Sequence, residues 1–123
     1  MAADLPAVFA RLRPLYARHA AKAVVLKDAP GAYLLGTHEV REKDGYRTWL
    51  GGVEIKKNYV SAHLMPVYAD PALLDGVDPA LMKRMQGKSC FNFKEVDDRL
   101  FADFEALVEA SVARFVAEGR LAG

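Results

Sequence analysis

Residues 46–65 read YRTWLGGVEIKKNYVSAHLM, and this stretch decides the fold. Two runs of alternating apolar and polar residues flank Lys57-Asn58, a pattern typical of a β-hairpin with a two-residue loop. Such a loop places Glu54 opposite Ser61, and each face of the hairpin then collects its own kind of side chain because side chains alternate along a strand. The expected apolar face contains Trp49, Val53, Ile55, Val60, Ala62 and Leu64, and the expected polar face contains Glu54, Lys56, Tyr59, Ser61 and His63.

The hairpin extends in both directions into a larger sheet. Two further strand-like runs, at residues 23–26 and 32–40, precede it and are joined by short turns. Connections this short make neighbouring strands antiparallel, so the sequence predicts a meander of four strands. A short aromatic alternation at residues 89–93 predicts a fifth strand, at the sheet edge or lining a cleft.

Helical spacing of apolar residues brackets this sheet. An N-terminal helix begins at Asp4 and contains Pro14, which predicts a break or kink just before the proline. Asp-Pro pairs predict one helical turn near residues 72–74 and a short helix from about 80 to 85. A long helix from about residue 98 completes a single α+β domain, whose helices we expect on the apolar face of the sheet.

Composition limits the class of protein. The chain has 123 residues, of which 52% are hydrophobic and 27% charged, as expected for one compact domain. The longest stretch without a charge covers residues 58–69, too short for the roughly 20 residues of a membrane-spanning helix. The N-terminus does not resemble a secretory signal, and the single Cys90 cannot form an internal disulfide. We therefore expect a cytoplasmic protein.

Charge is distributed unevenly along the chain although the net charge is only +1. Residues 56–94 carry 6 basic and 3 acidic side chains, whereas residues 95–123 carry 3 basic and 7 acidic ones. This basic excess falls well short of that of a typical nucleic-acid binder, so we expect no nucleic-acid partner. The asymmetry predicts a mildly basic cleft and an acidic helix.

The basic region contains a candidate ligand site. Alternation along residues 88–94 places Lys88, Cys90, Asn92 and Lys94 on one side of the strand. Cations beside an amide can hold a carboxylate or a phosphate, but lysines on an edge strand also serve simply to prevent edge-to-edge pairing. His63 is the titratable member of the polar hairpin face, with a hydrogen-bonded structural role as the alternative.

Two other chemistries have weaker support. Cys90 is a candidate nucleophile only if the fold brings His63 or Lys88 beside it, and a free cysteine is more often a buried structural residue. The sequence has no metal-ligand motif such as His-x-x-x-His or Cys-x-x-Cys. Carboxylates near the start of the last helix suit a weakly held hard cation, although capping and a solvated acidic face also explain them. These acids are Asp97, Asp98, Asp103, Glu105 and Glu109.

Two motifs, YVSAHLMPVY at residues 59–68 and MQGKSCFNFK at residues 85–94, carry a family resemblance. Together they resemble the YdhG-like family of bacterial domains of unknown function, over roughly residues 24–115. The resemblance implies a small α+β fold, and part of the wider group is likened to frataxin and proposed to carry iron. It also suggests that Tyr59, His63, Lys88 and Asn92 lie near one another.

These observations lead to one main functional expectation and two alternatives. We expect a non-catalytic binding module with a polar and basic cleft for a small anionic ligand, acting as a monomer or homodimer without a membrane or nucleic-acid partner. The first alternative is a frataxin-like iron carrier that uses the five acids of the last helix, and the second is an enzyme that uses His63 or Cys90. The expected ligand-binding residues are Tyr59, His63, Lys88, Asn92 and Lys56.

Overall fold

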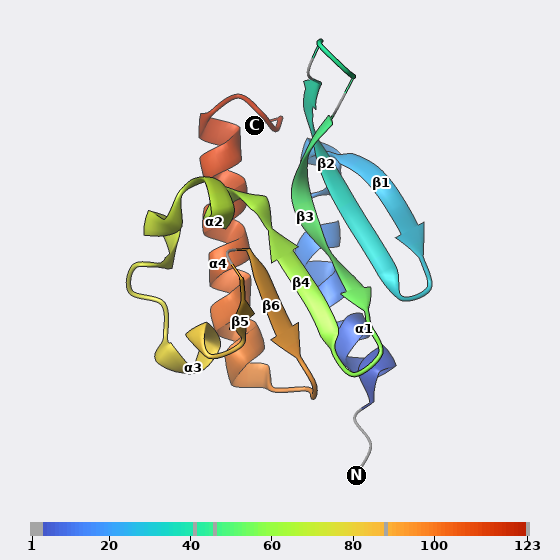
Figure 1. Ribbon diagram of the computed structural model, residues 1–123, viewed down its shortest axis with the longest axis vertical. Coiled ribbons are helices and arrows are strands. Elements are labelled where there is room, and N and C mark those ends of the chain that lie inside the picture. Colours follow the sequence, from blue (N-terminus) through green and yellow to red (C-terminus); the bar gives the residue numbers. More distant parts are fainter. Residues whose placement is uncertain (1–3, 41, 46, 88, 123) are drawn as a thin grey trace.

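The computed structural model describes residues 4–40, 42–45, 47–87 and 89–122, and Figure 1 shows the arrangement of its elements. In these ranges the helical elements are α1 (Leu5–Ala17), η1 (Ala20–Lys22), α2 (Met65–Ala69), η2 (Pro71–Leu74), α3 (Pro79–Met82) and α4 (Asp98–Ala117). The strands are β1 (Val24–Ala29), β2 (Ala32–Val40), β3 (Arg47–Ile55), β4 (Val60–Leu64), β5 (Met85–Gln86) and β6 (Cys90–Phe93).

The strands of the described ranges form one antiparallel sheet of six, in the order β1-β2-β3-β4-β6-β5. The predicted α+β class and the antiparallel meander of the first four strands are confirmed. The predicted count of four to five strands is too low, because the end of the expected helix at residues 80–85 forms β5 instead. β6 consequently lies between β4 and β5 and is not an edge strand.

One face of the sheet is covered by α1 and α4, which lie behind it in the view of Figure 1. The two helices contact each other, and α1 also contacts β3 and β4. The buried side of α4 faces the core between the helices and the sheet. Its eight buried residues are Leu100, Phe101, Phe104, Leu107, Val108, Ser111, Val112 and Phe115. No helix in the described ranges is long and apolar enough to cross a membrane.

Helix α1 begins as predicted, but it continues through the point where a break or kink was predicted. The Asp4 carboxylate accepts a hydrogen bond from the Ala7 backbone N–H at 3.1 Å, so Asp4 caps the helix. The helix then runs through Pro14 without a break. Pro14 is exposed, whereas Leu12 and Leu15 on either side of it are buried against the core. Their burial holds the helix together although the proline lacks an N–H donor.

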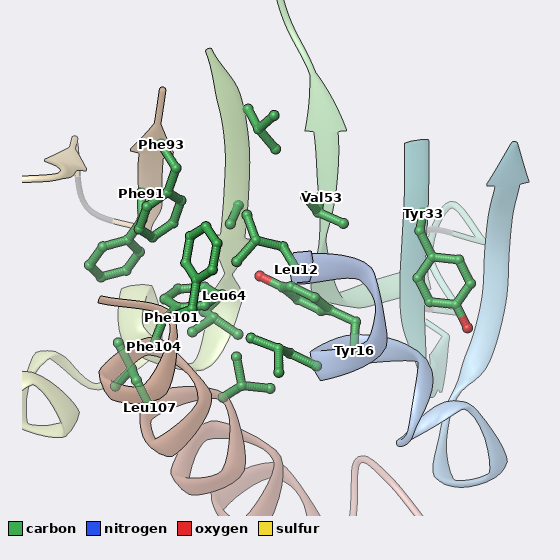
Figure 2. Close-up of a cluster of buried hydrophobic side chains, with 14 of the residues drawn as sticks. Leu12, Tyr16, Tyr33, Val53, Leu64, Phe91, Phe93, Phe101, Phe104 and Leu107 are labelled. Atoms are coloured by element: carbon green, nitrogen blue, oxygen red, sulfur yellow. The ribbon is translucent and has the colours of Figure 1, made fainter. Parts of the chain in front are cut away.

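Aromatic rings fill the space between β6 and α4, as Figure 2 shows. The Phe91 and Phe104 ring centroids lie 5.3 Å apart, and Phe93 lies 5.3 Å from Phe101 and 5.5 Å from Phe104. These pairs meet edge to face, an arrangement that favours the opposite charges of ring edge and ring face. The cluster anchors β6 firmly on α4, and this leaves the alternate side chains of β6 on the other side of the sheet.

The hairpin of β3 and β4 has the predicted register, with Glu54 opposite Ser61. The predicted face of Trp49 is wrong, however. Next to β2 the pairing passes from Gly51 to Trp49 and skips Leu50, which is a β-bulge. The bulge turns Leu50 into the core, where it is fully buried, and turns Trp49 to the opposite face beside the ring of His63.

Candidate functional site

The sheet face turned away from α1 and α4, which we call the open face, carries the polar side chains of β4, β5 and β6. The pairing of β4 with β6 places His63 opposite Cys90 and Ser61 opposite Asn92. β5 extends the first of these rows, since Gln86 lies opposite Cys90. The residues between them in β6 are buried in the core, as the predicted alternation requires.

A hollow of about 300 Å³ opens at one end of this face. No carboxylate from the part of the chain that the structure describes lines it. Cations with amide and hydroxyl donors favour negatively charged oxygen atoms, which makes the hollow chemically suited to a small anion. We call it the basic hollow, and its residues are Tyr59, Lys83, Arg84, Met85, Gln86, Asn92 and Lys94.

Three segments of the chain build the basic hollow. Tyr59 comes from the turn before β4, Asn92 from β6, and the segment with Arg84 from the connection between α3 and β5. The Asn92 backbone N–H donates a hydrogen bond to the Arg84 carbonyl at 2.8 Å, so the cationic segment is held directly beside the amide. Leu81 and Phe93 are buried beneath these segments and fix them to the core.

The cations of the basic hollow keep their charge available to a ligand. Lys83, Arg84 and Lys94 are exposed, and none of them forms an ion pair with an acid in the described ranges. Two neighbouring depressions share Arg84 and contain the acids Glu95 and Asp97, among others. The acids therefore border the basic hollow on one side without lining it.

The predicted ligand-binding residues fall into separate groups. Tyr59 and Asn92 both line the basic hollow. Lys56 lies on the same side of the hairpin but pairs with Glu54, whose Oε1 is 3.7 Å from the Lys56 Nζ, and it does not line the hollow. Lys88 lies outside the described residues. His63 is placed one row away, beside Cys90.

His63 and Cys90 form a close pair on the open face. The Cys90 Sγ lies 2.8 Å from His63 Nδ1 and 3.2 Å from Nε2, and the Ser61 Oγ lies 3.4 Å from Nε2. The Trp49 ring covers the imidazole from β3, with 5.3 Å between the ring centroids. We call these four residues the thiol cluster. The structure thus supplies the condition under which Cys90 becomes a candidate nucleophile.

Partial burial keeps this pair uncharged at neutral pH. Burial lowers the pKa of His63, which Glu54 raises and Lys56 lowers by smaller amounts. Burial also raises the pKa of the Cys90 thiol, while a hydrogen bond from Ser61 acts in the opposite direction. Both shifts follow from the cost of placing a charge away from water. The resting state is therefore a thiol beside a neutral imidazole.

A buried tyrosine connects the thiol cluster to the helical layer. The Tyr16 hydroxyl of α1 donates a hydrogen bond to the His63 carbonyl oxygen at 2.8 Å, and Figure 2 shows this hydroxyl pointing toward β4. The same oxygen lies where a Cβ on Gly51 would come within 2.0 Å, so only glycine fits in β3 at this point. Burial, and to a lesser extent Cys90, raises the pKa of Tyr16 well above its usual range, so the hydroxyl stays protonated as a donor.

The acids predicted to bind metal begin with Asp97, Asp98 and Asp103. The Asp97 carboxylate caps α4 by accepting hydrogen bonds from the backbone N–H groups of Arg99 and Leu100, both at 3.1 Å. Asp98 pairs with Arg11 of α1. Asp103 lines a separate depression against the segment that joins η2 to α3. These three side chains therefore serve different neighbours.

Glu105 and Glu109, the other two predicted metal ligands, both face Arg18. Their carboxylate oxygens lie 2.6 and 3.2 Å from the Arg18 Nη1, and Glu109 also lies 3.1 Å from the His19 Nε2. Among the residues described, no group of three or more His, Cys, Asp or Glu side chains could hold a metal ion. The geometry gives the iron alternative no support.

Sequence reasoning missed Lys83, Arg84 and Gln86 as members of the site. The basic excess of residues 56–94 was the available signal, and Lys83 and Arg84 immediately precede the second of the two motifs. The region was expected to form a helix, which would have directed consecutive side chains around an axis. Instead α3 ends at Met82, so Lys83 and Arg84 lie in the connection to β5, and Gln86 lies in β5 opposite Cys90.

Comparisons with protein-family models, with curated proteins and with solved structures found no match to this chain. The open face has two distinct features, the basic hollow and the thiol cluster, and β6 supplies a residue to each of them.

Proposed function

We propose that the protein is a binding module for a small anionic ligand, which it holds in the basic hollow through a phosphate or carboxylate group. The observation that carries this proposal is the convergence of three cations without ion-pair partners in the described ranges on one hollow of about 300 Å³. A hollow of this size is at the lower end of the range for small-molecule sites.

The side chains that line the hollow have two different roles, which follow from their chemistry. Lys83, Arg84 and Lys94 supply positive charge, and the Arg84 guanidinium can donate two parallel hydrogen bonds to a single phosphate or carboxylate. Tyr59 and Asn92 add neutral donors that orient the ligand. In this assignment Tyr59 and Asn92 keep the ligand-binding roles expected from the sequence, and Lys83, Arg84 and Lys94 supply the positive charge.

An NMR titration of the intact protein with inorganic phosphate tests the proposal. We expect amide shifts confined to the neighbourhood of Tyr59, residues 83–86 and residues 92–94, weakening as the salt concentration rises because the charges are exposed. Arg84→Ala should weaken phosphate binding severalfold. Lys43→Ala is the charge-matched control, since Lys43 is exposed in the turn between β2 and β3 and should leave binding unchanged.

Two outcomes would overturn the proposal. One is a titration without shifts around the basic hollow at millimolar phosphate. The other is an Arg84→Ala variant that binds phosphate as tightly as the Lys43→Ala control, because the hollow would then make no specific contribution.

A further inference from the structure

The thiol cluster and the basic hollow are neighbours on the open face. Gln86, which lines the hollow, lies opposite Cys90 in the pairing of β5 with β6. Asn92, another lining residue, follows Cys90 by two residues on the same side of β6, a separation of about 7 Å along the strand. A molecule anchored in the hollow by an anionic group can therefore reach the Cys90 sulfur with its next few atoms.

The surroundings of His63 leave it able to accept a proton. From β3 it faces Trp49, Glu54 and Lys56, and the Tyr16 hydroxyl of α1 is engaged with its backbone carbonyl and not with its ring. Its ring nitrogens face the Cys90 Sγ at 2.8 and 3.2 Å and the Ser61 hydroxyl at 3.4 Å. The imidazole is thus placed to accept the proton of the thiol.

We propose that Cys90 and His63 form a thiol–disulfide exchange pair, whose substrate is a small disulfide that carries carboxylate groups. The pair is inferred from the contacts of its own side chains. The preference for an acidic disulfide rests on the proposed function, because the cations of the basic hollow would bind the carboxylates.

The exchange step is balanced without any further reactant. The Cys90 sulfur attacks one sulfur of the substrate while its proton passes to His63, so a new bond forms between the Cys90 Sγ and that sulfur. The disulfide bond of the substrate breaks, and the departing thiolate takes the proton back from the imidazolium. Cys90 is oxidised to a mixed disulfide, and the other half of the substrate is reduced to a thiol.

Two disulfide reagents that release an absorbing thiol test this step. All reaction reports on Cys90, because it is the single cysteine of the sequence. Dithiobis(nitrobenzoate) carries two carboxylates, and dithiodipyridine is uncharged at neutral pH. We expect His63→Gln to react with both at least about a hundredfold more slowly, the lower end of the range for loss of a general base. Arg84→Ala should slow only the dicarboxylate reagent. His38→Gln, which changes an exposed histidine at the far end of β2, should match the wild type.

The pH profile of the wild-type protein is a second readout that does not depend on a variant. With His63 as the base, the reaction rate should change by less than about twofold between pH 8 and pH 6.5, because a pKa below the ordinary histidine value of about 6.5 leaves most of the imidazole neutral. An unassisted thiol reacts only as its thiolate, so its rate would fall about tenfold for each pH unit in that interval. A tenfold decline per unit would overturn the exchange pair.

The variant results separate this proposal from the proposed function. An unchanged rate in folded His63→Gln overturns the exchange pair, even where phosphate still binds in the basic hollow. Equal effects of Arg84→Ala on both reagents, with phosphate binding intact in the wild type, overturn only the choice of an acidic substrate. Absence of phosphate binding overturns the proposed function, and the His63 result then decides the exchange pair alone.

Discussion

One face of the sheet packs against the hydrophobic core, and the other face carries the candidate functional site. The covered face is filled by aromatic and aliphatic side chains, and Tyr16 contributes a buried hydroxyl that is hydrogen bonded. The open face instead contains the basic hollow, whose cations are exposed, and the thiol cluster, in which His63 and Cys90 are partly buried. A domain of two layers leaves one sheet face without a helix, so that face can vary in chemistry while the core stays intact. Substitutions on the two faces should therefore have different effects.

The largest effect is expected for Phe104→Ala on the covered face. Phe104 is fully buried, and its ring lies against Phe91, Phe93 and Tyr16. Loss of the ring should lower the free energy of unfolding by about 3–5 kcal/mol, because it removes apolar burial and leaves a cavity. Urea denaturation measures this change, and a loss below about 1 kcal/mol would contradict the described core.

A smaller loss of stability is expected for Tyr16→Phe, which removes a hydrogen bond between α1 and β4. The variant keeps the ring but removes the hydrogen bond from the Tyr16 hydroxyl to the His63 carbonyl, and the loss of one such bond costs about 0.5–1.5 kcal/mol. Tyr33→Phe is the matched control, since no hydrogen bond of the Tyr33 hydroxyl occurs within the described ranges. Equal unfolding free energies for the two variants would show that the Tyr16 bond adds nothing to stability.

Low pH should destabilise the folded protein partly through protonation of His63 on the open face. Burial lowers the pKa of His63 in the folded protein, whereas the unfolded chain has the ordinary histidine pKa of about 6.5. The folded state therefore prefers the neutral imidazole, and its stability falls as the pH drops below about 6.5 toward the folded pKa. The melting temperature of His63→Gln should decline less steeply with acid than that of the wild type. His38→Gln should decline like the wild type.

The smallest effect on stability is expected for Lys94→Ala in the basic hollow. Its side chain is exposed and forms no ion pair with an acid in the described ranges, so the free energy of unfolding should change by less than about 0.5 kcal/mol. Phosphate binding should nevertheless weaken. A destabilised Lys94→Ala variant would mean that the open face also supports the core, and that the division between the two faces is less complete.

The sequence predicted best those parts of the fold that depend on local patterns. Alternation and a two-residue loop were sufficient for the hairpin register, because a shift by one residue would exchange its two faces. Trp49 escaped this reasoning, since the bulge at Leu50 depends on the pairing of β3 with β2 and leaves no trace in the alternation itself. The continuity of α1 through Pro14 likewise depends on tertiary packing.

The candidate site was predictable only in part for a related reason. Tyr59 and Asn92 could be placed together from the sequence because one precedes β4 and the other lies in β6, two strongly patterned strands that pair in the fold. Lys83 and Arg84 lie in the short connection between α3 and the two-residue strand β5, and neither segment is long enough for a periodic pattern to reveal it. The contact of His63 with Cys90 joins residues 27 positions apart, and the sequence could state it only as a condition.

The β-bulge at Leu50 also gives the protein an optical reporter of its own. It turns the single tryptophan of the chain, Trp49, from the core to a position beside the ring of His63. Indole fluorescence is quenched by a protonated imidazole and by a nearby thiol or disulfide. Protonation of His63 and modification of Cys90 should therefore each change the native emission, so that chemistry at this point of the open face can be followed in real time without an added label.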